Sequence, residues 1–211
     1  MKKAYILIHG NLSSLPRLQD MITPSDIVIC ADGAAEFAFE QNILPDVIIG
    51  DLDSISSKVQ EYFEKEDTQW KKFPREKDAT DAELAIRYAL DSDVDELIIL
   101  GLLGDRVDHM LSNIFHISEI AQDKQCSIIE GNACMYFVKD HIIINGKKGD
   151  ELSLIPLKGR CGRISTRGLY YPLQQEYLEF GSTRGISNVF SESTIEVRVD
   201  QGTLLVIHRH F

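Results

Sequence analysis

Acidic side chains follow short apolar or aromatic runs at four places in the sequence. They are Asp32 in 31–33, Asp51 and Asp53 in 50–54, Asp78 and Asp81 in 74–81, and Asp105 and Asp108 in 101–109. Carboxylates gathered at one place repel each other, and a hard cation with oxygen ligands relieves that repulsion. Mg²⁺ fits this chemistry, because it takes one or two carboxylates together with substrate phosphates. Lys77 and Arg106 lie in the same segments and would pair with phosphate oxygens.

Each acidic segment alone also has a purely structural explanation, because aspartate after a strand is common in turns and as a helix N-cap. The combination of GDLDS, KDATD and GLLGDRVDH is much more specific than one D-x-D. The sequence contains neither G-x-x-x-x-G-K-[ST] nor G-x-G-x-x-G. We therefore expect the metal, Lys77, Arg106 and the backbone N–H groups of 101–104 to hold the phosphates.

The first part of the chain, residues 1–130, predicts the elements that would position these side chains. Continuous apolar runs typical of buried parallel strands occupy 4–10, 26–33, 46–51, 69–73 and 96–101, and helical patterns occupy 34–41, 80–91 and 109–122. This alternation predicts an α/β domain with a doubly wound, mostly parallel sheet. Ligands bind such sheets at the carboxyl ends of the strands, so the four acidic segments should share one edge.

The second part, residues 131–211, has a different texture. Short β-rich runs are broken by glycine and asparagine, which predicts a C-terminal antiparallel β-sandwich. Residues 195–207 read as one hairpin with its turn near 200–202. We expect the aromatic residues of this part to pack in its core: Tyr170, Tyr171, Tyr177, Phe180 and Phe190. His208 and His210 alternate as in a strand with no third ligand nearby, so we do not expect them to bind a metal.

Composition excludes several classes of protein. The 211 residues carry a formal net charge of −11, which argues against a general electrostatic grip on nucleic acid. No apolar run approaches the roughly 20 residues that span a bilayer, and 1–10 lack the apolar core and cleavage site of a signal peptide. We expect a cytoplasmic protein without membrane contact. The four cysteines show no C-x-x-C spacing, so a zinc–thiolate site is not predicted.

In these motifs the sequence resembles the thiamine pyrophosphokinase family over nearly its whole length. The resemblance rests on the order and spacing of 31–35 (ADGAA), 50–54 (GDLDS), 77–81 (KDATD), 101–109 with Asn113, and 181–188 (GSTRGISN). It implies an α/β catalytic domain that binds ATP and metal, and a β-sandwich that binds thiamine and dimerises. It further implies a homodimer with active sites at the subunit interface, and Mg²⁺-dependent transfer of diphosphate from ATP to the hydroxyl of thiamine, releasing AMP.

The resemblance also implies roles for individual residues. Asp51, Asp53 and Asp81 would surround the metal and phosphates, and Arg106 would join them in catalysis. The ATP and phosphate side of the cleft would be lined by Asp32, Lys77, Asp78, Thr80, Arg106 and Asp108. Ser187 and Asn188 would contact thiamine. The sequence departs from the family at two positions: Asp105 stands where glycine is frequent, and Val189 where glutamate is frequent.

Several alternatives stay open at this stage. Either Asp81 or Asp53 would accept the alcohol proton, and sequence does not separate a base from a metal ligand. A related diphosphokinase acting on a pterin alcohol would share the acidic segments. A D-x-D nucleotidyl- or glycosyltransferase would release pyrophosphate or a nucleoside diphosphate instead of AMP. A non-catalytic thiamine- or nucleotide-binding protein would bind both ligands without forming AMP.

Overall fold

A computed structural model describes residues 1–12 and 15–210 of the chain. These residues divide into two compact units. Unit 1 comprises 1–117 and 124–131, and unit 2 comprises 118–123 and the described residues from 132 onward. No helix within the described residues has the length and apolar character needed to cross a lipid bilayer.

Unit 1 is built on six strands that pair with one another in parallel. They are β1 (Lys3–Leu7), β2 (Ile27–Ala31), β3 (Val47–Gly50), β4 (Gln69–Lys72), β5 (Glu96–Leu100) and β6 (Gln125–Glu130). Within this unit the strand order is β6-β5-β1-β2-β3-β4. The structure confirms the five predicted strands and their parallel pairing, and it adds β6, which the sequence analysis did not identify.

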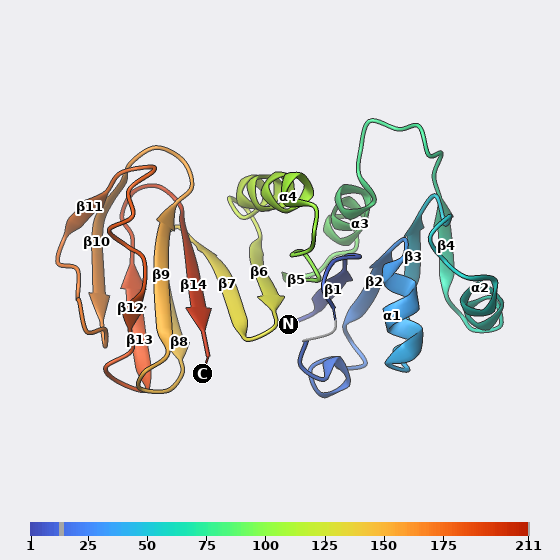
Figure 1. Ribbon diagram of the computed structural model, residues 1–211, viewed down its shortest axis with the longest axis horizontal. Helices are drawn as coiled ribbons and strands as arrows, with labels where there is room; N and C mark the ends of the chain where they lie inside the picture. The colour runs from blue at the N-terminus through green and yellow to red at the C-terminus, as the bar shows by residue number, and fades with distance from the viewer. Residues whose placement is uncertain (13–14, 211) are drawn as a thin grey trace. The chain divides into compact units, whose positions relative to one another are not determined.

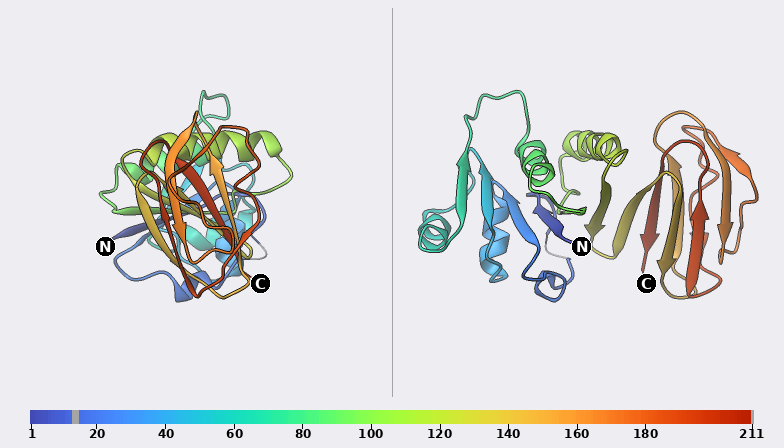
Figure 2. Two further views of the ribbon diagram at one scale, coloured as in Figure 1. Left: turned by 90° about the vertical axis from the view of Figure 1, so that its left-hand side faces the viewer. Right: turned by 180° about the vertical axis from the view of Figure 1, so that it is seen from behind.

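The helical segments of unit 1 connect these strands. They are the 3₁₀ turn η1 (Leu18–Asp20), α1 (Ala34–Glu40), α2 (Ser57–Phe63), α3 (Asp81–Leu90) and α4 (Val107–Ile120), whose last residues belong to unit 2. Figures 1 and 2 show α1 on the opposite face of the sheet from α3. This double winding is what right-handed crossovers require when the strand order reverses, so the predicted fold class is confirmed. Helix α2, capped by the Ser56 side chain, was not predicted.

The strand order reverses beside β1. From β1 the chain moves outward through β2, β3 and β4, and it then returns to place β5 on the other side of β1. β1 and β5 are neighbouring strands, and the loops that follow them leave their carboxyl ends in opposite directions. Such a switch point is where open α/β sheets bind ligands. It also brings the ends of β2, β3 and β4 to the same edge.

Unit 2 consists of two antiparallel sheets. One contains β12 (Asn188–Val189), β9 (Glu151–Pro156), β14 (Leu204–Arg209) and β7 (Ala133–Val138); the other contains β11 (Glu176–Leu178), β10 (Cys161–Arg167), β13 (Thr194–Arg198) and β8 (His141–Asn145). Alternate residues of β9, β10 and β13 are buried, and both sheets contribute to one apolar cluster. The structure confirms the predicted β-sandwich.

The predicted hairpin over 195–207 is wrong. Strand β13 pairs with β8 and β10, whereas β14 pairs with β7 and β9, so the two strands belong to different sheets. The segment between them crosses from one sheet to the other, with Val199 and Thr203 buried. Alternating apolar residues indicate one buried face in each strand, but they do not identify the pairing partner.

The expectation for the aromatic residues of unit 2 is correct for one of five. Phe190 is 1% exposed and belongs to the core, but the other four are exposed by 47–68%: Tyr170, Tyr171, Tyr177 and Phe180. These four lie in or beside loops and the short edge strand β11, where no second layer covers them. Their side chains are available for contact with a ligand or another chain.

Candidate active site

The end of β3 presents two carboxylates because the backbone there turns sharply. Asp53 donates its backbone N–H to Asp51 Oδ1 (3.2 Å), and Leu52 between them has a left-handed φ of 69°. Gly50 makes the approach to β2 possible, since a Cβ at this position would lie 2.8 Å from Cβ of Asp32. The sequence GDLDS thus brings the end of β3 against the residue that follows β2.

Asp32 completes a cluster of three carboxylates with Asp51 and Asp53. One oxygen of each lies within 4.8 Å of the others. Asp32 is 8% exposed and has a left-handed φ of 44°, and its Oδ1 accepts no hydrogen bond from any residue that the structure describes. Three like charges with an unpartnered, buried oxygen are costly unless a cation binds them. The cluster suits a hard cation such as Mg²⁺.

Asp81 stands at the start of α3, outside this cluster of three. Its Oδ1 lies 3.0 Å from Nζ of Lys77. Burial raises the pKa of Asp81 above its usual range, the Lys77 ammonium opposes this, and the negative charges of Asp32 and Asp51 add to it. The charges of the cluster therefore affect the pKa of Asp81, although Asp81 is not one of its three members.

Thr80 and Asp78 both precede α3, but only Thr80 lines the pocket. The Thr80 hydroxyl accepts the backbone N–H of Glu83 (3.1 Å) and so caps the helix. Thr80 also lines the pocket described below, whereas Asp78 is exposed and does not. Arg75 belongs to the same segment, and its Nη1 lies 3.6 Å from Asp53 Oδ2.

The segment after β5 contributes the arginine. Arg106 forms a two-pronged pair with Asp108, with N–O distances of 3.0 and 2.7 Å. Hydrogen bonds from Arg106 hold the pKa of Asp108 well below its usual range, although both side chains are about two-thirds exposed. Arg106 lines the pocket and Asp108 does not.

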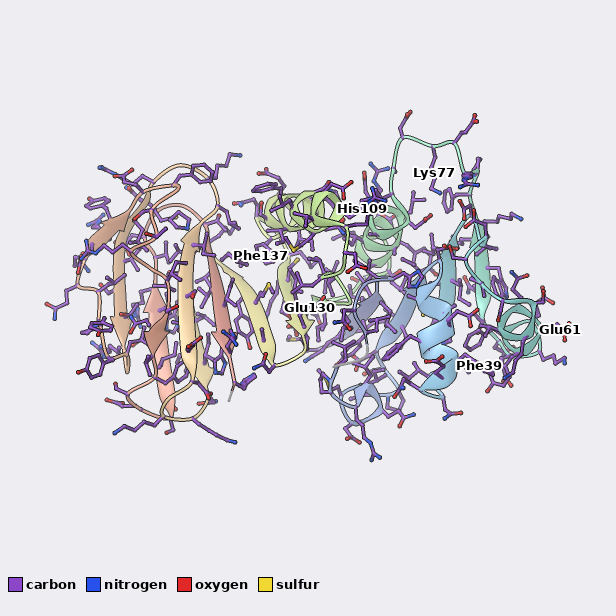
Figure 3. All side chains as sticks on the ribbon, in the orientation of Figure 1. Phe39, Glu61, Lys77, His109, Glu130 and Phe137 are labelled. Carbon is purple, nitrogen blue, oxygen red and sulfur yellow. The ribbon has the colours of Figure 1, made fainter. Side chains whose placement is uncertain are left out.

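Two loops meet at the switch point between β1 and β5. Asn11 donates its backbone N–H to the Leu103 carbonyl (2.6 Å), and a Cβ on Gly10 would lie 2.2 Å from the Gly101 carbonyl oxygen. From β6, the buried Glu130 accepts the backbone N–H of Leu103 (2.8 Å). Burial raises the pKa of Glu130 to about 6. Figure 3 labels Glu130 at the end of β6.

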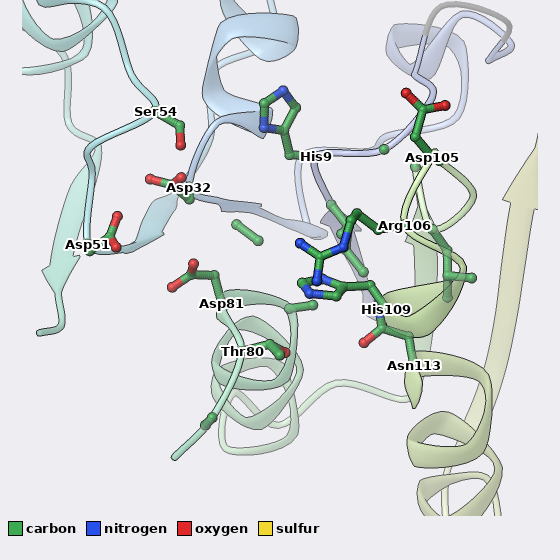
Figure 4. A pocket seen from close by; sticks show the side chains of 18 of the residues that line it. His9, Asp32, Asp51, Ser54, Thr80, Asp81, Asp105, Arg106, His109 and Asn113 are labelled. Atoms are coloured by element: carbon green, nitrogen blue, oxygen red, sulfur yellow. The ribbon is translucent and has the colours of Figure 1, made fainter. Parts of the chain in front are cut away.

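These segments enclose a pocket of about 820 Å³ within unit 1. Its lining is Ile8–Asn11 after β1, Ala31 and Asp32 after β2, Asp51 and Ser54 after β3, Arg75, Lys77 and Ala79–Ala82 after β4, and Gly101, Leu102, Gly104–Arg106, His109 and Asn113 after β5. Figure 4 shows Asp32, Asp51 and Asp81 pointing toward one another on one side, with Arg106 and His109 across from them. The prediction that the four acidic segments share one edge is confirmed.

The structure brings only part of the predicted site together. The pocket lining includes Asp32, Asp51, Lys77, Thr80, Asp81 and Arg106, but not Asp53, Asp78 or Asp108. Sequence reasoning did not identify His9 and Asn11, or Arg75, as lining residues. His9 and Asn11 flank a glycine directly after the first parallel strand, and this pattern could have predicted a ligand-binding loop. Asn113, one helical turn after His109, lies on the same face of α4 and is buried.

Ser187 and Asn188 belong to unit 2. Ser187 is exposed, has a left-handed φ of 57°, and donates its backbone N–H to Ser153 Oγ (3.1 Å). The buried Asn188 amide is used within the unit: its Oδ1 accepts the N–H groups of Tyr171 (3.0 Å) and Val189 (2.9 Å), and its Nδ2 donates to the Tyr171 carbonyl (2.7 Å). In this structure Asn188 therefore fixes the loop that carries the exposed Tyr171.

Fold and pocket together define a two-part protein, with an acidic pocket at the switch point of a parallel sheet and a separate β-sandwich. A solved thiamine pyrophosphokinase from Bacillus subtilis superposes with a TM-score of 0.89 at 24% identity, covering 99% of both chains. A thiamine pyrophosphokinase from the same organism is 27% identical over 210 residues, 98% of each chain. Thiamine pyrophosphokinase 3 of Oryza sativa subsp. japonica is 26% identical over 218 residues, 90% of this chain and 80% of the relative.

Family profiles cover both units. The catalytic domain of thiamin pyrophosphokinase matches residues 18–129, and its vitamin B1 binding domain matches residues 140–204. The chain belongs to the thiamin pyrophosphokinase family.

Proposed function

We propose that the protein transfers diphosphate from ATP to the hydroxyl of thiamine, giving thiamine diphosphate and AMP, in a reaction that requires Mg²⁺. The observation that carries this proposal is the cluster of Asp32, Asp51 and Asp53 at the edge of the switch-point pocket. Membership of the family supports ATP and thiamine as the substrates, and the acidic cluster supports a bound divalent metal. A pocket of about 820 Å³ has the size expected of a nucleotide-sized ligand site.

The metal would be held by Asp51 and Asp53, with Asp32 in place of the Asp81 of our sequence prediction. Asp32 is preferred because its carboxylate lies within 4.8 Å of those of Asp51 and Asp53, whereas Asp81 lies outside this group with its Oδ1 3.0 Å from Lys77 Nζ. When bound, Mg²⁺ would neutralise charge on the phosphate oxygens.

The remaining pocket residues act on the substrates. Lys77 and Arg106 would contact the phosphates. Arg106 would give up its exposed ion pair with Asp108, because the triphosphate carries more negative charge than one carboxylate. Asp81 is the candidate base that accepts the thiamine hydroxyl proton, because it lines the pocket and lies outside the cluster of three. Little covalent chemistry falls to the protein in such a transfer, so positioning and charge neutralisation carry it.

We assign the α/β domain, residues 1–130, to ATP, metal and catalysis, and the sandwich, residues 131–211, to thiamine binding and dimerisation. Ser187 is the proposed polar contact to thiamine, since it is exposed and its backbone is fixed by Ser153. Asn188 would support that contact by fixing the exposed Tyr171. By the family pattern we further propose a cytoplasmic homodimer with active sites at the subunit interface.

The decisive experiment measures AMP release from ATP and Mg²⁺ with and without thiamine. We expect thiamine-dependent AMP that is lost in Asp53→Asn and Asp81→Asn and retained in Asp20→Asn, a matched change at an exposed aspartate of η1. Release of AMP with pterin alcohols but not with thiamine would show that the acceptor of the diphosphate is a pterin alcohol and would reject thiamine. Release of pyrophosphate would reject diphosphate transfer, and binding of both ligands without any product would reject catalysis.

A further inference from the structure

Three potential metal ligands converge within unit 2. Asp150 immediately precedes β9, His208 lies in β14, and His210 follows β14. One donor atom from each lies within 4.8 Å of the other two. The antiparallel pairing of β14 with β9 creates this meeting, because it places His208 opposite Leu152, two residues from Asp150. The prediction that the histidines have no third ligand nearby is therefore wrong, because Asp150 lies beside them in the folded chain.

The distances place His210 outside hydrogen-bond range of the Asp150 carboxylate but within reach of an ion that all three side chains could share. Oδ2 of Asp150 lies 2.9 Å from His208 Nε2 and 3.7 Å from His210 Nδ1. The second distance is too long for a hydrogen bond. Tetrahedral zinc, with bonds of about 2.0–2.1 Å to nitrogen and oxygen, separates its ligand atoms by about 3.3 Å. That value falls between the two observed distances.

Neighbouring groups orient the three side chains as outer partners orient metal ligands. The backbone N–H of Lys147 donates to Asp150 Oδ2 (2.9 Å) and fixes the carboxylate. Cys134 Sγ lies 3.8 Å from His210 Nε2, so the other nitrogen of that ring faces Asp150. The Phe190 ring stacks on His208, with 4.6 Å between centroids. The polar contacts to Asp150 and His210 are of the kind that orient metal ligands, and Phe190 fixes the His208 ring by packing.

Gly146 keeps one side of the cluster open. A Cβ at this position would lie 2.7 Å from Asp150 Oδ2 and 2.9 Å from His208 Nε2, so any side chain there would press on both donor atoms. Asp150 and His208 are buried, but the His210 side chain is 47% exposed. An ion could reach the cluster past His210, and water could fill a fourth position.

We propose that Asp150, His208 and His210 bind a zinc ion, which ties the segment before β9 to the end of β14. Two imidazoles and one carboxylate favour a borderline ion such as Zn²⁺ over Mg²⁺, whose preferred ligands are oxygens. The site differs in ligand chemistry from the all-carboxylate cluster of unit 1. Its role is to stabilise the sandwich, and the proposed diphosphate transfer does not depend on it.

The test titrates the full-length protein, freed of metals by chelation, with Co²⁺ in the presence of excess Mg²⁺, which occupies the acidic cluster. We expect one equivalent of Co²⁺ to give the intense visible absorption of tetrahedral coordination, and Zn²⁺ to displace it. Zn²⁺ should also raise the melting temperature. His210→Ala should weaken binding by more than the 10- to 100-fold that loss of an outer partner typically causes.

The matched control is His141→Ala, which removes a partly exposed histidine that pairs with Glu196 in the other sheet. It should leave the cobalt spectrum and affinity unchanged. Asp150→Asn, which keeps an oxygen for Lys147, should lose binding as His210→Ala does. Absence of a tetrahedral spectrum, or an equal affinity in His210→Ala, would overturn the proposal and leave only a hydrogen-bonded Asp150–His208 pair. His210→Ala should keep full Mg²⁺-dependent AMP release, so this result is independent of the proposed function.

Discussion

The two units use buried polar side chains in opposite ways. In unit 1, Asp32 is buried with an oxygen that has no partner among the described residues, and it faces Asp51 and Asp53 of the same charge. In unit 2, Asn188 is equally buried, yet its amide oxygen and nitrogen together make three hydrogen bonds to backbone groups. Both residues belong to motifs shared with the family, so motif membership alone does not separate their roles.

Asp32 and Asn188 differ in whether the folded chain supplies partners for their buried polar atoms. A buried amide whose oxygen and nitrogen are both hydrogen-bonded stabilises the folded state, and its removal leaves buried backbone groups without partners. A cluster of unpaired like charges destabilises the folded state and is relieved by a ligand of opposite charge. We therefore expect changes at the first cluster to affect activity, and changes at Asn188 to affect stability.

Asp51→Asn should produce the largest effect and should separate activity from stability. Loss of a metal-binding carboxylate should lower Mg²⁺-dependent AMP release by at least about 100-fold. The unfolding free energy without metal should rise by about 1 kcal/mol, because one of three repelling charges is gone. Steady-state kinetics and urea unfolding measure the two quantities.

Addition of Mg²⁺ sharpens this test. The ion should raise the unfolding free energy of the wild type by mass action and have much less effect on Asp51→Asn. If Asp51→Asn is markedly less stable than the wild type in metal-free buffer, the cluster is a structural element, and its contrast with Asn188 fails.

Asn188→Ala should have the next largest effect, and on stability. The backbone N–H and C=O of Tyr171 and the N–H of Val189 would lose their partner, which should lower the unfolding free energy by about 2–3 kcal/mol. Ser187→Ala is the matched control, since Ser187 is exposed, and its stability should change by less than about 0.5 kcal/mol. Urea unfolding compares the two variants.

Kinetics then assign the thiamine contact. Ser187→Ala should raise the KM for thiamine with the KM for ATP unchanged. An Asn188→Ala protein that keeps wild-type stability but loses thiamine affinity would show that Asn188 contacts the ligand directly, contrary to the hydrogen bonds described here.

The acidic pocket could be predicted because both of its causes are local. Strands buried on two faces are continuous apolar runs, and in a parallel sheet their carboxyl ends share one edge. The apolar runs before Asp32 and Asp51 were therefore sufficient to predict which edge of the sheet carries the pocket. The same reasoning missed His9 and Asn11, because their loop carries no charge to attract attention.

Unit 2 was harder to predict because its features depend on which strands pair. The alternation in β13 and β14 was read correctly, but it could not reveal that the two strands lie in different sheets. The meeting of Asp150 and His208, 58 residues apart, follows from the same pairing and left no local signal. The four exposed aromatic residues were misjudged because composition does not show which loops lack a covering layer.

Glu130 of unit 1 is intermediate between Asp32 and Asn188. It is a buried carboxylate that accepts backbone hydrogen bonds but forms no ion pair among the described residues. It accepts the N–H of Leu103, and backbone hydrogen bonds from Leu103 and Leu102 only partly offset the effect of burial on its pKa. Its pKa is raised from the ordinary 4.5 to about 6, so the folded protein binds this proton more tightly than the unfolded chain. The contribution to stability is full below pH 4.5 and is lost as the pH rises through about 6.

Glu130→Gln should therefore be more stable than the wild type above pH 6, by up to about 2 kcal/mol, because a neutral amide can accept the Leu103 N–H without the buried charge. The gap should close as the pH falls toward 4.5. Urea unfolding at several pH values measures it. Glu96→Gln is the matched control of opposite sign, since buried Glu96 pairs with Lys3 at 3.4 Å and loss of that charge should destabilise. A gap for Glu130→Gln that does not vary with pH would mean that burial of the charge is not what distinguishes Glu130.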